Sequence, residues 1–252
     1  MMANERQNLI IVEVDQRGTV TTADLIEKFE VSPITIRRDL ADLADRGLIA
    51  KVHGGARSIR STNNPTFDTK FNTHRGIKES LARAAVEFIQ DGDSVAFSAG
   101  TTCAAIATLA ASRQNLTVIT NSTRVADEFR SSESTQLFVT GGKRTPTEAL
   151  IGPLALASLE RLHFDTLFTS VHAADPSSGL TTPSLEEAET LRSMIRSAHR
   201  VVVVFDHSKW GVTALSTFAH WNEVDVVIVD QELPKIAVEE LKELVEKVVI
   251  AS

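Results

Sequence analysis

Cysteine is nearly missing from this chain: Cys103 is the only one in 252 residues. A single cysteine excludes an internal disulfide framework and is typical of proteins that stay in a reducing compartment. Long apolar runs are missing as well. Residues 9–12 are too few for the core of a signal peptide, and residues 201–205 fall far short of the roughly 20 that a membrane-spanning helix needs. We therefore expect no membrane partner and a cytoplasmic location.

A surplus of positive charge is also absent, since the formal net charge is −7. The charge is unevenly distributed, however. Residues 1–60 hold nine basic and nine acidic residues, so the rest of the chain carries the whole negative charge. Residues 37–60 hold six basic residues against three acidic ones: Arg37, Arg38, Arg46, Lys51, Arg57 and Arg60 against Asp39, Asp42 and Asp45. This local basic strip is compatible with DNA binding.

Residues 32–40, SPITIRRDL, have the pattern of a two-faced helix. Ser32 before Pro33 predicts the helix start, because a serine hydroxyl caps free N–H groups and proline suits the first turn. One apolar stripe recurs at i, i+4 and i+7, namely Ile36, Leu40 and Leu43. At about 100° per residue, Arg37 and Arg38 lie on roughly the opposite side. The helix is expected to be anchored by one face and to offer arginines from the other, although an isolated arginine pair is often merely solvated.

Two further helical patterns precede this one, over residues 5–15 and after Thr22. The tight junction at Val31 and Ser32 predicts a helix-turn-helix, whose second helix lies in the DNA major groove and here ends at Gly47. Residues 48–60 alternate apolar and polar around Gly54 and Gly55, as a small hairpin does. The arrangement predicts a winged helix whose wing carries a set of basic side chains: Lys51, His53, Arg57 and Arg60.

The chain is long enough for two modest domains. We predict a DNA-binding domain over residues 1–57, a polar linker with Pro65 over 58–74, and a larger domain over 75–252. In the last, apolar runs at 94–97, 116–119, 136–139, 165–168, 201–205 and 224–229 alternate with helical patterns at 78–90, 102–112, 122–130, 153–162, 184–198 and 235–246. This alternation predicts an α/β domain with a mostly parallel sheet covered on both faces.

Five of the expected strands end in polar or glycine-rich residues: SAGTT, TNS, TGGK, TSVHA and DHSK. Ligands of open parallel sheets bind beyond the carboxyl ends of the strands, so we expect a small polar ligand there. Residues 98–102, between a strand and a helix, resemble a phosphate cradle, because glycine allows close approach and the helix offers free N–H groups. Lys143 and Lys209 supply cations near this edge, although each lysine can equally be solvated.

The sequence resembles the DeoR family of bacterial transcription regulators over almost its full length. The most specific match is VSPITIRRDLADLADRGLIAKVHGGA, and GTT, VITNS, TGG, FDTLF and DHSKW follow in the same order. The resemblance implies a winged helix that binds double-stranded operator DNA and a sensor domain for a phosphorylated sugar or related metabolite. It also implies that the sensor is similar in fold to ribose-5-phosphate isomerase and the CoA transferases, and that the chain forms a homo-oligomer, a dimer or tetramer.

The residues that match the family's motifs form two predicted sites. The DNA-binding set is Ser32, Thr35, Arg37, Arg38, His53, Gly54 and Gly55. The effector-binding set is Ser98, Gly100, Thr101, Thr102, Thr120, Asn121, Gly141, Gly142 and Lys209. Ser98 stands where family members commonly have aspartate, and residues 169–173 replace a glycine-containing turn, with His172 as a candidate replacement contact or an ordinary core or surface residue. No catalytic residue, metal or cofactor is expected.

Three functions remain open from the sequence. The family resemblance favours a repressor of carbohydrate-metabolism genes that an effector releases from its operator. The alternative is a sugar-phosphate isomerase with an appended DNA-binding domain, whose general base would be Glu187, Asp165 or Asp206. Asp165 opens a strand and is expected at the wrong sheet edge. The third possibility makes the larger domain chiefly an assembly module.

Overall fold

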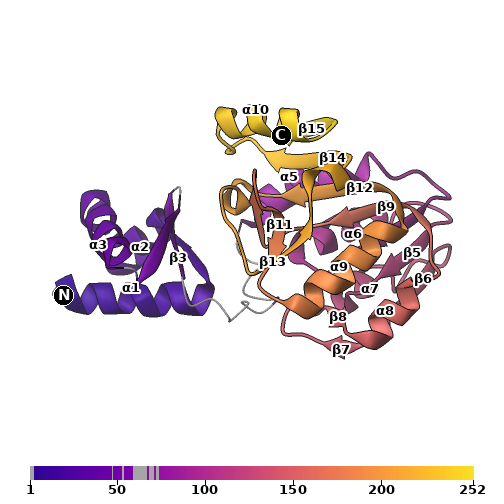
Figure 1. Cartoon of the computed structure of the whole chain (residues 1–252), viewed down its shortest axis with the longest axis horizontal. Helices are drawn as coiled ribbons and strands as arrows, with labels where there is room; N and C mark the ends of the chain where they lie inside the picture. Colours follow the sequence, from indigo (N-terminus) through magenta and orange to yellow (C-terminus); the bar gives the residue numbers. More distant parts are fainter. Residues whose placement is uncertain (1–2, 47, 53, 59–66, 68–70, 72–73) are drawn as a thin grey trace. The chain divides into compact units, whose positions relative to one another are not determined.

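The computed structural model describes residues 3–46, 48–52, 54–58, 67, 71 and 74–252. The chain divides into two compact units, Met1–Thr69 and Lys70–Ser252 (Figure 1). Most of the linker predicted over residues 58–74 lies outside the described residues. Among the helices that are described, none combines the length and the apolar character needed to cross a bilayer.

The first unit contains three helices and a small sheet: α1 (Ala3–Arg17), β1 (Thr19–Thr21), α2 (Thr22–Phe29), α3 (Pro33–Asp45), β2 (Ile49–Val52) and β3 (Gly55–Ser58). Each of these six elements contributes at least one apolar side chain to the core of the unit: Ile10, Val14, Val20, Leu25, Ile36, Leu40, Leu43, Ile49 and Ala56. Leu9, which belongs to the apolar run of the first helical pattern, is 45% exposed. The buried face of α1 instead carries Ile10 and Val14, at the i, i+4 spacing of one helix face.

The turn between α2 and α3 follows from local capping. Thr21 and Asp24 form a reciprocal capping box at the start of α2. The helix ends at Glu30, whose φ of 52° places it in the left-handed region and stops the chain from continuing as a helix. Two residues later, the Ser32 hydroxyl accepts the Thr35 N–H at 3.2 Å and starts α3.

The hairpin predicted around residues 54 and 55 is present as β2 and β3, and a third strand extends it. Strand β1 pairs with β3, which gives the order β1-β3-β2. A side-chain carbon on Gly55 would lie 2.0 Å from the carbonyl oxygen of Val20, so only glycine allows this approach of β3 to β1. The sequence does not indicate β1, because Thr19–Thr21 is too short to show an alternating pattern.

The second unit is built on a seven-stranded parallel sheet in the order β15-β14-β12-β9-β4-β5-β6. Its strands are β4 (Ser94–Phe97), β5 (Thr117–Thr120), β6 (Gln136–Val139), β9 (Phe164–Thr169), β12 (Ala198–Phe205), β14 (Val226–Asp230) and β15 (Lys247–Ala251). The first six coincide with the six predicted runs. The parallel α/β architecture and the N-terminal helix-turn-helix are thus confirmed.

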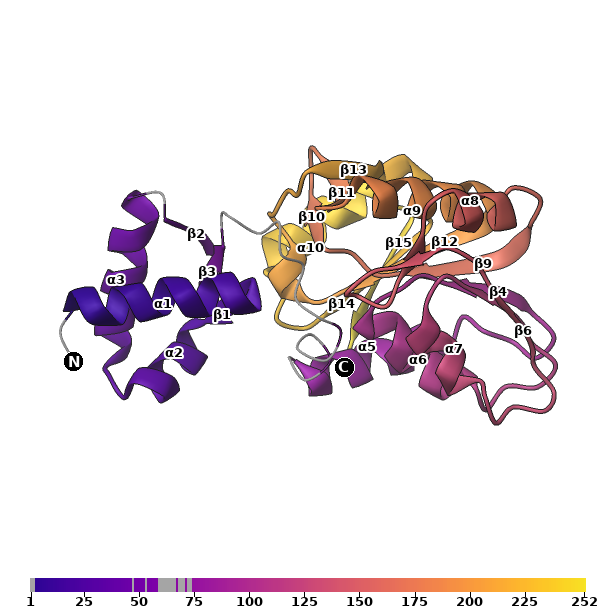
Figure 2. The ribbon, with the colours of Figure 1, turned by 90° about the horizontal axis from the view of Figure 1, so that it is seen from below.

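Helices cover both faces of this sheet, as predicted (Figure 2). One face carries α5 (Arg75–Val86), α6 (Thr101–Ala110) and α7 (Thr123–Glu128). The other carries α8 (Pro153–Leu159) and α9 (Leu185–Ser197) together with an antiparallel sheet of β10 (Ala173–Asp175), β11 (Gly179–Thr182) and β13 (Ser216–Ala219). The hairpin of β7 (Lys143–Arg144) and β8 (Leu150–Ile151) and helix α10 (Lys235–Leu244) complete the unit.

Candidate functional site

Helix α3 has the two faces expected from its sequence. Ile36, Leu40 and Leu43 are buried, with at most 2% of their surface exposed. Arg37 and Arg38 are exposed, and within the described residues neither guanidinium has a hydrogen bond or an ion pair. The two charges therefore stand free on the outer face of a helix fixed by its other side, which is how a recognition helix presents cations to DNA phosphates and base edges.

A buried ion pair fixes α3 against α1. Asp39 is 4% exposed, and its carboxylate accepts hydrogen bonds from Arg6 Nε at 2.6 Å and from Gln7 Nε2 at 3.2 Å. Arg46 in turn donates to Gln7 Oε1 at 3.3 Å. Asp39 directly follows the two exposed arginines, so this contact holds the part of the helix that carries them.

Ser32 and Thr35 lie at the start of α3, where their hydroxyl groups are 2.8 Å apart. Gly54 is exposed at the turn of the wing, with a φ of 78°, whereas Gly55 is buried against β1. Gly55 thus has a packing role in the wing. His53, predicted to meet DNA, lies outside the described residues, as do Gly47 and Arg60.

Arg57 is the described arginine of the wing. Its side chain is half-buried, and burial lowers the pKa of its guanidinium. The buried Nε has no hydrogen-bond partner among the described residues. An unpaired buried donor costs stability, and this Nε is enclosed by the protein, so it is not itself a contact point for a phosphate.

In the second unit, several predicted effector residues use their polar groups to join loops at the carboxyl edge of the sheet. The Ser98 hydroxyl is 2.9 Å from that of Thr169, which links β4 to β9. Asn121 accepts the Ala99 N–H at 3.0 Å and donates to the Leu150 carbonyl at 3.2 Å. The structure thus gives Ser98 and Asn121 a shaping role, because their hydrogen bonds are made within the protein.

Thr120 has a similar internal role. Its hydroxyl donates to the Phe97 carbonyl at 2.8 Å and accepts the Ser122 N–H at 3.0 Å. The first bond joins the end of β5 to the end of β4, and the second fixes the turn that follows β5.

The loop between β4 and α6 leads into a helix N-terminus that no side chain caps. Gly100 has φ 144°, and a side-chain carbon there would lie 2.4 Å from Ser170 Oγ, so glycine is required for the close approach of two loops. Thr101 and Thr102 form the first turn of α6, and within the described residues no hydrogen bond occupies their hydroxyls. Free N–H groups and hydroxyls together make a surface that suits an anion.

Gly141 and Gly142, also predicted to bind the effector, lie at a different part of the edge. A side-chain carbon on Gly142 would lie 2.5 Å from the Ile151 carbonyl oxygen, so this loop packs on β8. Lys143 Nζ forms an exposed ion pair with Glu186 at 3.0 Å. Lys209 follows β12, which lies four strands from β6, and neighbouring strands lie about 4.8 Å apart, so the ends of these two strands are about 19 Å apart. The loop of Gly141 and Gly142 therefore begins well away from Lys209.

Lys209 belongs to a group of charged side chains whose proximity cannot be read from the sequence. Lys209 ends the helical turn His207–Lys209, while Lys78 comes from α5. Burial lowers the pKa of Lys78 to about 8, the charge of Asp206 opposes that shift, and the charge of Lys209 adds to it. Burial alone would raise the pKa of Asp206, but Lys209 and hydrogen bonds from His74 and Ser208 hold it well below its ordinary value. Two lysines and an aspartate whose lowered pKa favours its ionised form therefore act on one another at this edge.

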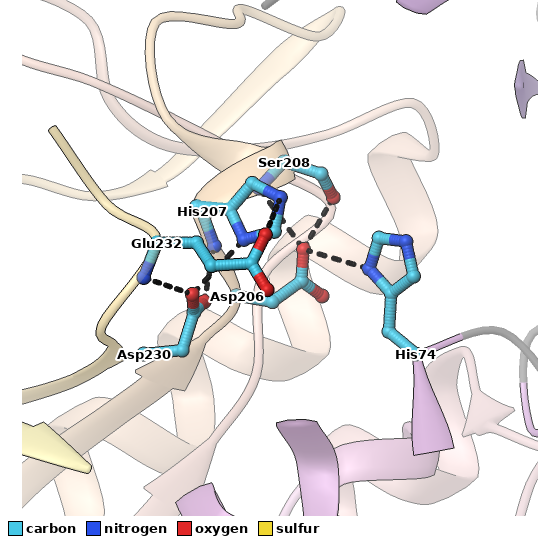
Figure 3. Close-up of polar contacts among 6 residues, drawn as sticks. All are labelled: His74, Asp206, His207, Ser208, Asp230 and Glu232. Carbon is cyan, nitrogen blue, oxygen red and sulfur yellow. Dashed lines mark hydrogen bonds and ion pairs between the residues drawn. The ribbon is translucent and has the colours of Figure 1, made fainter. Parts of the chain in front are cut away.

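Two histidines complete this group (Figure 3). His74 Nδ1 lies 3.8 Å from Asp206 Oδ1, and the His74 and His207 rings are stacked with centroids 5.7 Å apart. His207 Nδ1 lies 3.0 Å from Asp230 Oδ1, and this hydrogen bond raises the pKa of His207. Burial would raise the pKa of Asp230, yet hydrogen bonds from His207 bring it below its ordinary value. The carboxylate of Asp230 therefore favours the charged form of His207.

The carboxylates weighed as a general base have other roles. Asp165 accepts the Ser94 N–H at 2.9 Å at the amino edge of the sheet, the edge opposite the carboxyl ends. Glu187 accepts the hydroxyls of Thr147 and Thr182 at 2.9 and 3.1 Å. His172 is half-buried. Among the described residues no three His, Cys, Asp or Glu side chains are placed to hold a metal ion.

Comparison with known proteins extends over both units. Residues 6–62 match the model of the DeoR-like helix-turn-helix domain, and residues 73–231 match the model of the DeoR C-terminal sensor domain. A putative aga operon transcriptional repressor of Escherichia coli O157:H7 is 35% identical over 95% of this chain and 90% of its own length. The glycerol-3-phosphate regulon repressor of Escherichia coli K12 is 33% identical over 93% of each chain.

Among solved structures, ribose 5-phosphate isomerase A of Methanocaldococcus jannaschii is similar over 55% of each chain, with 17% identity and a TM-score of 0.42. A likeness at this level carries no information on activity. The two domain models and the relatives of matching length agree with the exposed arginines of α3 and with the polar carboxyl edge of the parallel sheet. The chain belongs to the DeoR family, with a helix-turn-helix domain followed by a sensor domain.

Proposed function

We propose that this protein is a transcriptional repressor of carbohydrate-metabolism genes that a phosphorylated sugar or related metabolite releases from its operator. The observation that carries the proposal is the exposed, unpaired arginine pair on α3, the second helix of a helix-turn-helix whose other face is locked in the core. The relatives that match nearly the whole chain are named as repressors of the aga operon and of the glycerol-3-phosphate regulon. Operator DNA in the cytoplasm is the corresponding partner.

In this proposal Arg37 and Arg38 contact phosphates or guanine edges, with Ser32 and Thr35 at the helix start and Gly54 and His53 in the wing. An arginine that reads a base contributes about 1–3 kcal/mol of discrimination. Two copies of the helix, about one turn of DNA apart, would address two half-sites, so the proposal includes a homo-oligomer.

We place the effector phosphate at the carboxyl ends of β4, β9 and β12. Gly100, Thr101 and Thr102 would supply N–H and hydroxyl donors, and Lys78 and Lys209 would supply positive charge. The Asp206 carboxylate is buried and its negative charge acts on both lysines, which favours their charged forms at this edge. Thr120, Asn121 and Ser98 would shape this edge from behind, and Gly141 and Gly142 would bound the site on the side of β6.

We further propose that the sensor binds without conversion. An isomerase needs a base that takes a proton from carbon near neutral pH. Asp206 is the best placed carboxylate, but its strongly lowered pKa makes it a weak base. Glu187 and Asp165 already accept two hydrogen bonds each. A turnover assay with ribose 5-phosphate and hexose phosphates tests this, because product formation would contradict the proposal.

A thermal-shift screen of the full chain tests the sensor. The probes are glycerol 3-phosphate, fructose 1-phosphate, galactose 6-phosphate and fructose 6-phosphate, with inorganic phosphate and the unphosphorylated compounds as controls. A ligand at about 100 times its Kd stabilises by roughly 2.7 kcal/mol, a readily measured shift. The shift should vanish in Lys209→Met and persist in Lys143→Met, whose exposed lysine lies at the distant loop. Equal shifts in the two variants would contradict the placement.

A further inference from the structure

Strand β6 forms an outer edge of the seven-stranded sheet, and in the described part of the chain no strand pairs with it on the outside. All four of its residues are exposed; Leu137, Phe138 and Val139 have exposed fractions of 36, 51 and 44%. Figures 1 and 2 show this strand at the rim of the unit. An open apolar edge of this kind is a template for pairing with another strand.

The opposite edge of the same sheet differs in charge. Strand β15 begins with Lys247, whose Nζ lies 4.8 Å from the centre of the Phe88 ring, although its other residues are apolar and Ile250 is 49% exposed. A lysine on an edge strand discourages pairing with other chains, whereas β6 contains neither a charged residue nor proline. Of the two edges, β6 is the one that lacks such a charge.

The apolar surface of β6 continues onto α8. Leu154 is 68% exposed, and its Cβ would lie 3.4 Å from a side-chain carbon on Gly141, two residues beyond the strand. Leu137 and Val139 lie on one face of the strand and Phe138 on the other, so the open edge carries exposed apolar side chains on both faces; with Leu154 we call them the β6 patch. An apolar group that combines side chains with unpaired backbone suits a protein partner better than a small ligand.

The hydrogen bonds to β5 determine which backbone groups of β6 face outward. Gln136 and Thr140 donate their N–H groups to the carbonyls of Leu116 and Thr120, each at 2.9 Å. Backbone groups of successive strand residues point to opposite sides, so Phe138 also faces β5. Leu137 and Val139 consequently turn their N–H and C=O groups to the free edge.

We propose that β6 pairs with the same strand of a second copy of this chain, antiparallel and about a two-fold axis at Phe138. In this register Leu137 lies opposite Val139 of the second copy, and each such pair exchanges both its outward N–H and C=O groups. Phe138 meets its own counterpart as a non-hydrogen-bonded pair, at a Cα separation of about 4.5 Å. Every outward backbone group of the strand is then satisfied by the identical strand.

The charges at the two ends of β6 favour this orientation. Glu133 precedes the strand and Lys143 follows it, and both side chains are exposed. An antiparallel arrangement brings the acidic start of one strand toward the basic end of the other, whereas a parallel arrangement puts like charges together. Lys143 also forms an exposed ion pair with Glu186, so this complementarity adds to the matching backbone groups that favour a second copy over an unrelated extended peptide. The interface rests on the sheet edge and not on the proposed function, although a paired sensor suits two half-sites.

Cysteine cross-linking of the full chain tests the register. Phe138→Cys should form a disulfide-linked dimer under mild oxidation, because the two Cα atoms lie within the roughly 4.4–6.8 Å that a disulfide spans. Gln136→Cys is the matched control on the same strand and face. It lies opposite Thr140 of the second copy, about 13 Å from its own counterpart, and should stay uncrosslinked. The native thiol, Cys103, is buried and serves as the background.

Val139→Pro removes one outward N–H group, and proline is tolerated where a strand faces solvent. We expect the variant to keep the far-ultraviolet circular dichroism of the wild type and to weaken dimerisation at least about tenfold in sedimentation equilibrium, since it loses hydrogen bonds and close contact at once.

A monomeric wild type, equal cross-linking of the two cysteine variants, or no cross-linking of Phe138→Cys would overturn the interface. Failure to bind any DNA duplex would overturn the proposed function and leave a cross-linked Phe138→Cys dimer standing.

Discussion

At the scale of single residues, Arg38 is an exposed cation on α3 with no contact in the described structure that stabilises the fold. Arg38→Ala should weaken operator binding by about 1–3 kcal/mol and relax specificity at one base position. The midpoint of thermal unfolding should stay nearly unchanged. Arg130→Ala, which removes an exposed arginine from the sensor, is the control and should leave binding unaltered. A footprint of Arg38→Ala identical to that of the wild type would refute the assignment.

Asp39, the next residue of α3, is buried, so its substitution should lower the stability of the first unit, unlike that of Arg38. Asp39→Ala leaves the buried Arg6 without its partner and should destabilise the first unit by about 3–5 kcal/mol. Asp42→Ala on the exposed side of the same helix should change stability by less than about 0.5 kcal/mol. Urea unfolding of the two variants separates these expectations. Similar midpoints for both would show that the ion pair contributes little.

Lys78 gives effector binding a pH dependence. With a pKa of about 8, its ammonium is largely charged at pH 7 and largely neutral at pH 9, while a phosphate monoester remains a dianion throughout. A charge-assisted hydrogen bond contributes about 1.5–3 kcal/mol, so affinity should fall about five- to tenfold over this range, tenfold being the limit set by the change in the charged fraction of Lys78. Calorimetry at several pH values measures it. Lys78→Met should bind weakly and lose this dependence; a wild-type affinity that is constant from pH 7 to 9 would contradict the role.

At the scale of elements, the start of α6 depends on the backbone of Gly100. Gly100→Ala must strain a φ of 144° and displace Ser170, so we expect lower stability and weaker effector binding. Gly76→Ala, in the first turn of α5, meets no atom within 4 Å and should be neutral or stabilising. Thermal unfolding with and without inorganic phosphate tests both variants. An unaffected Gly100→Ala would show that the loop can relax.

The sequence predicts the long elements of this fold and misses the short ones. Six apolar runs match six strands of the parallel sheet because buried central strands need continuous β-branched and aromatic residues. Strands β10, β11 and β13 are three or four residues long and contain glycine, serine, threonine and alanine, so no period shows in their sequences. Strand β15 is not predicted, because its five residues directly follow the helical pattern of residues 235–246.

The candidate sites divide in the same manner. The outward position of Arg37 and Arg38 follows from local periodicity, since one helix fixes both faces. The sequence does not identify Lys78 as a site residue. It lies in an ordinary amphipathic helix, and only the fold brings the charges of Asp206 and Lys209 near it. The distance between Lys209 and the loop of Gly141 and Gly142 depends on strand order, which the sequence leaves open. Roles that depend on tertiary contacts therefore required the structure.

At the scale of the whole molecule, effector release in the proposed repressor requires a coupling free energy between the DNA-binding unit and the sensor. Such couplings are typically about 1–3 kcal/mol, and by reciprocity operator DNA must weaken effector binding by the same factor that the effector weakens DNA binding. Measuring the effector Kd with and without saturating duplex checks this balance. Unequal factors would mean that a further process, such as a change in oligomeric state, accompanies release.

The most direct test of the central claim is fluorescence anisotropy with a duplex enriched from a random pool by the full chain. We predict that the wild type binds this duplex, that the double variant Arg37→Ala, Arg38→Ala folds but does not bind it, and that a phosphorylated compound identified by thermal shift releases the wild type. Retained binding by the double variant, or undiminished binding at saturating concentrations of the stabilising compound, would contradict the account.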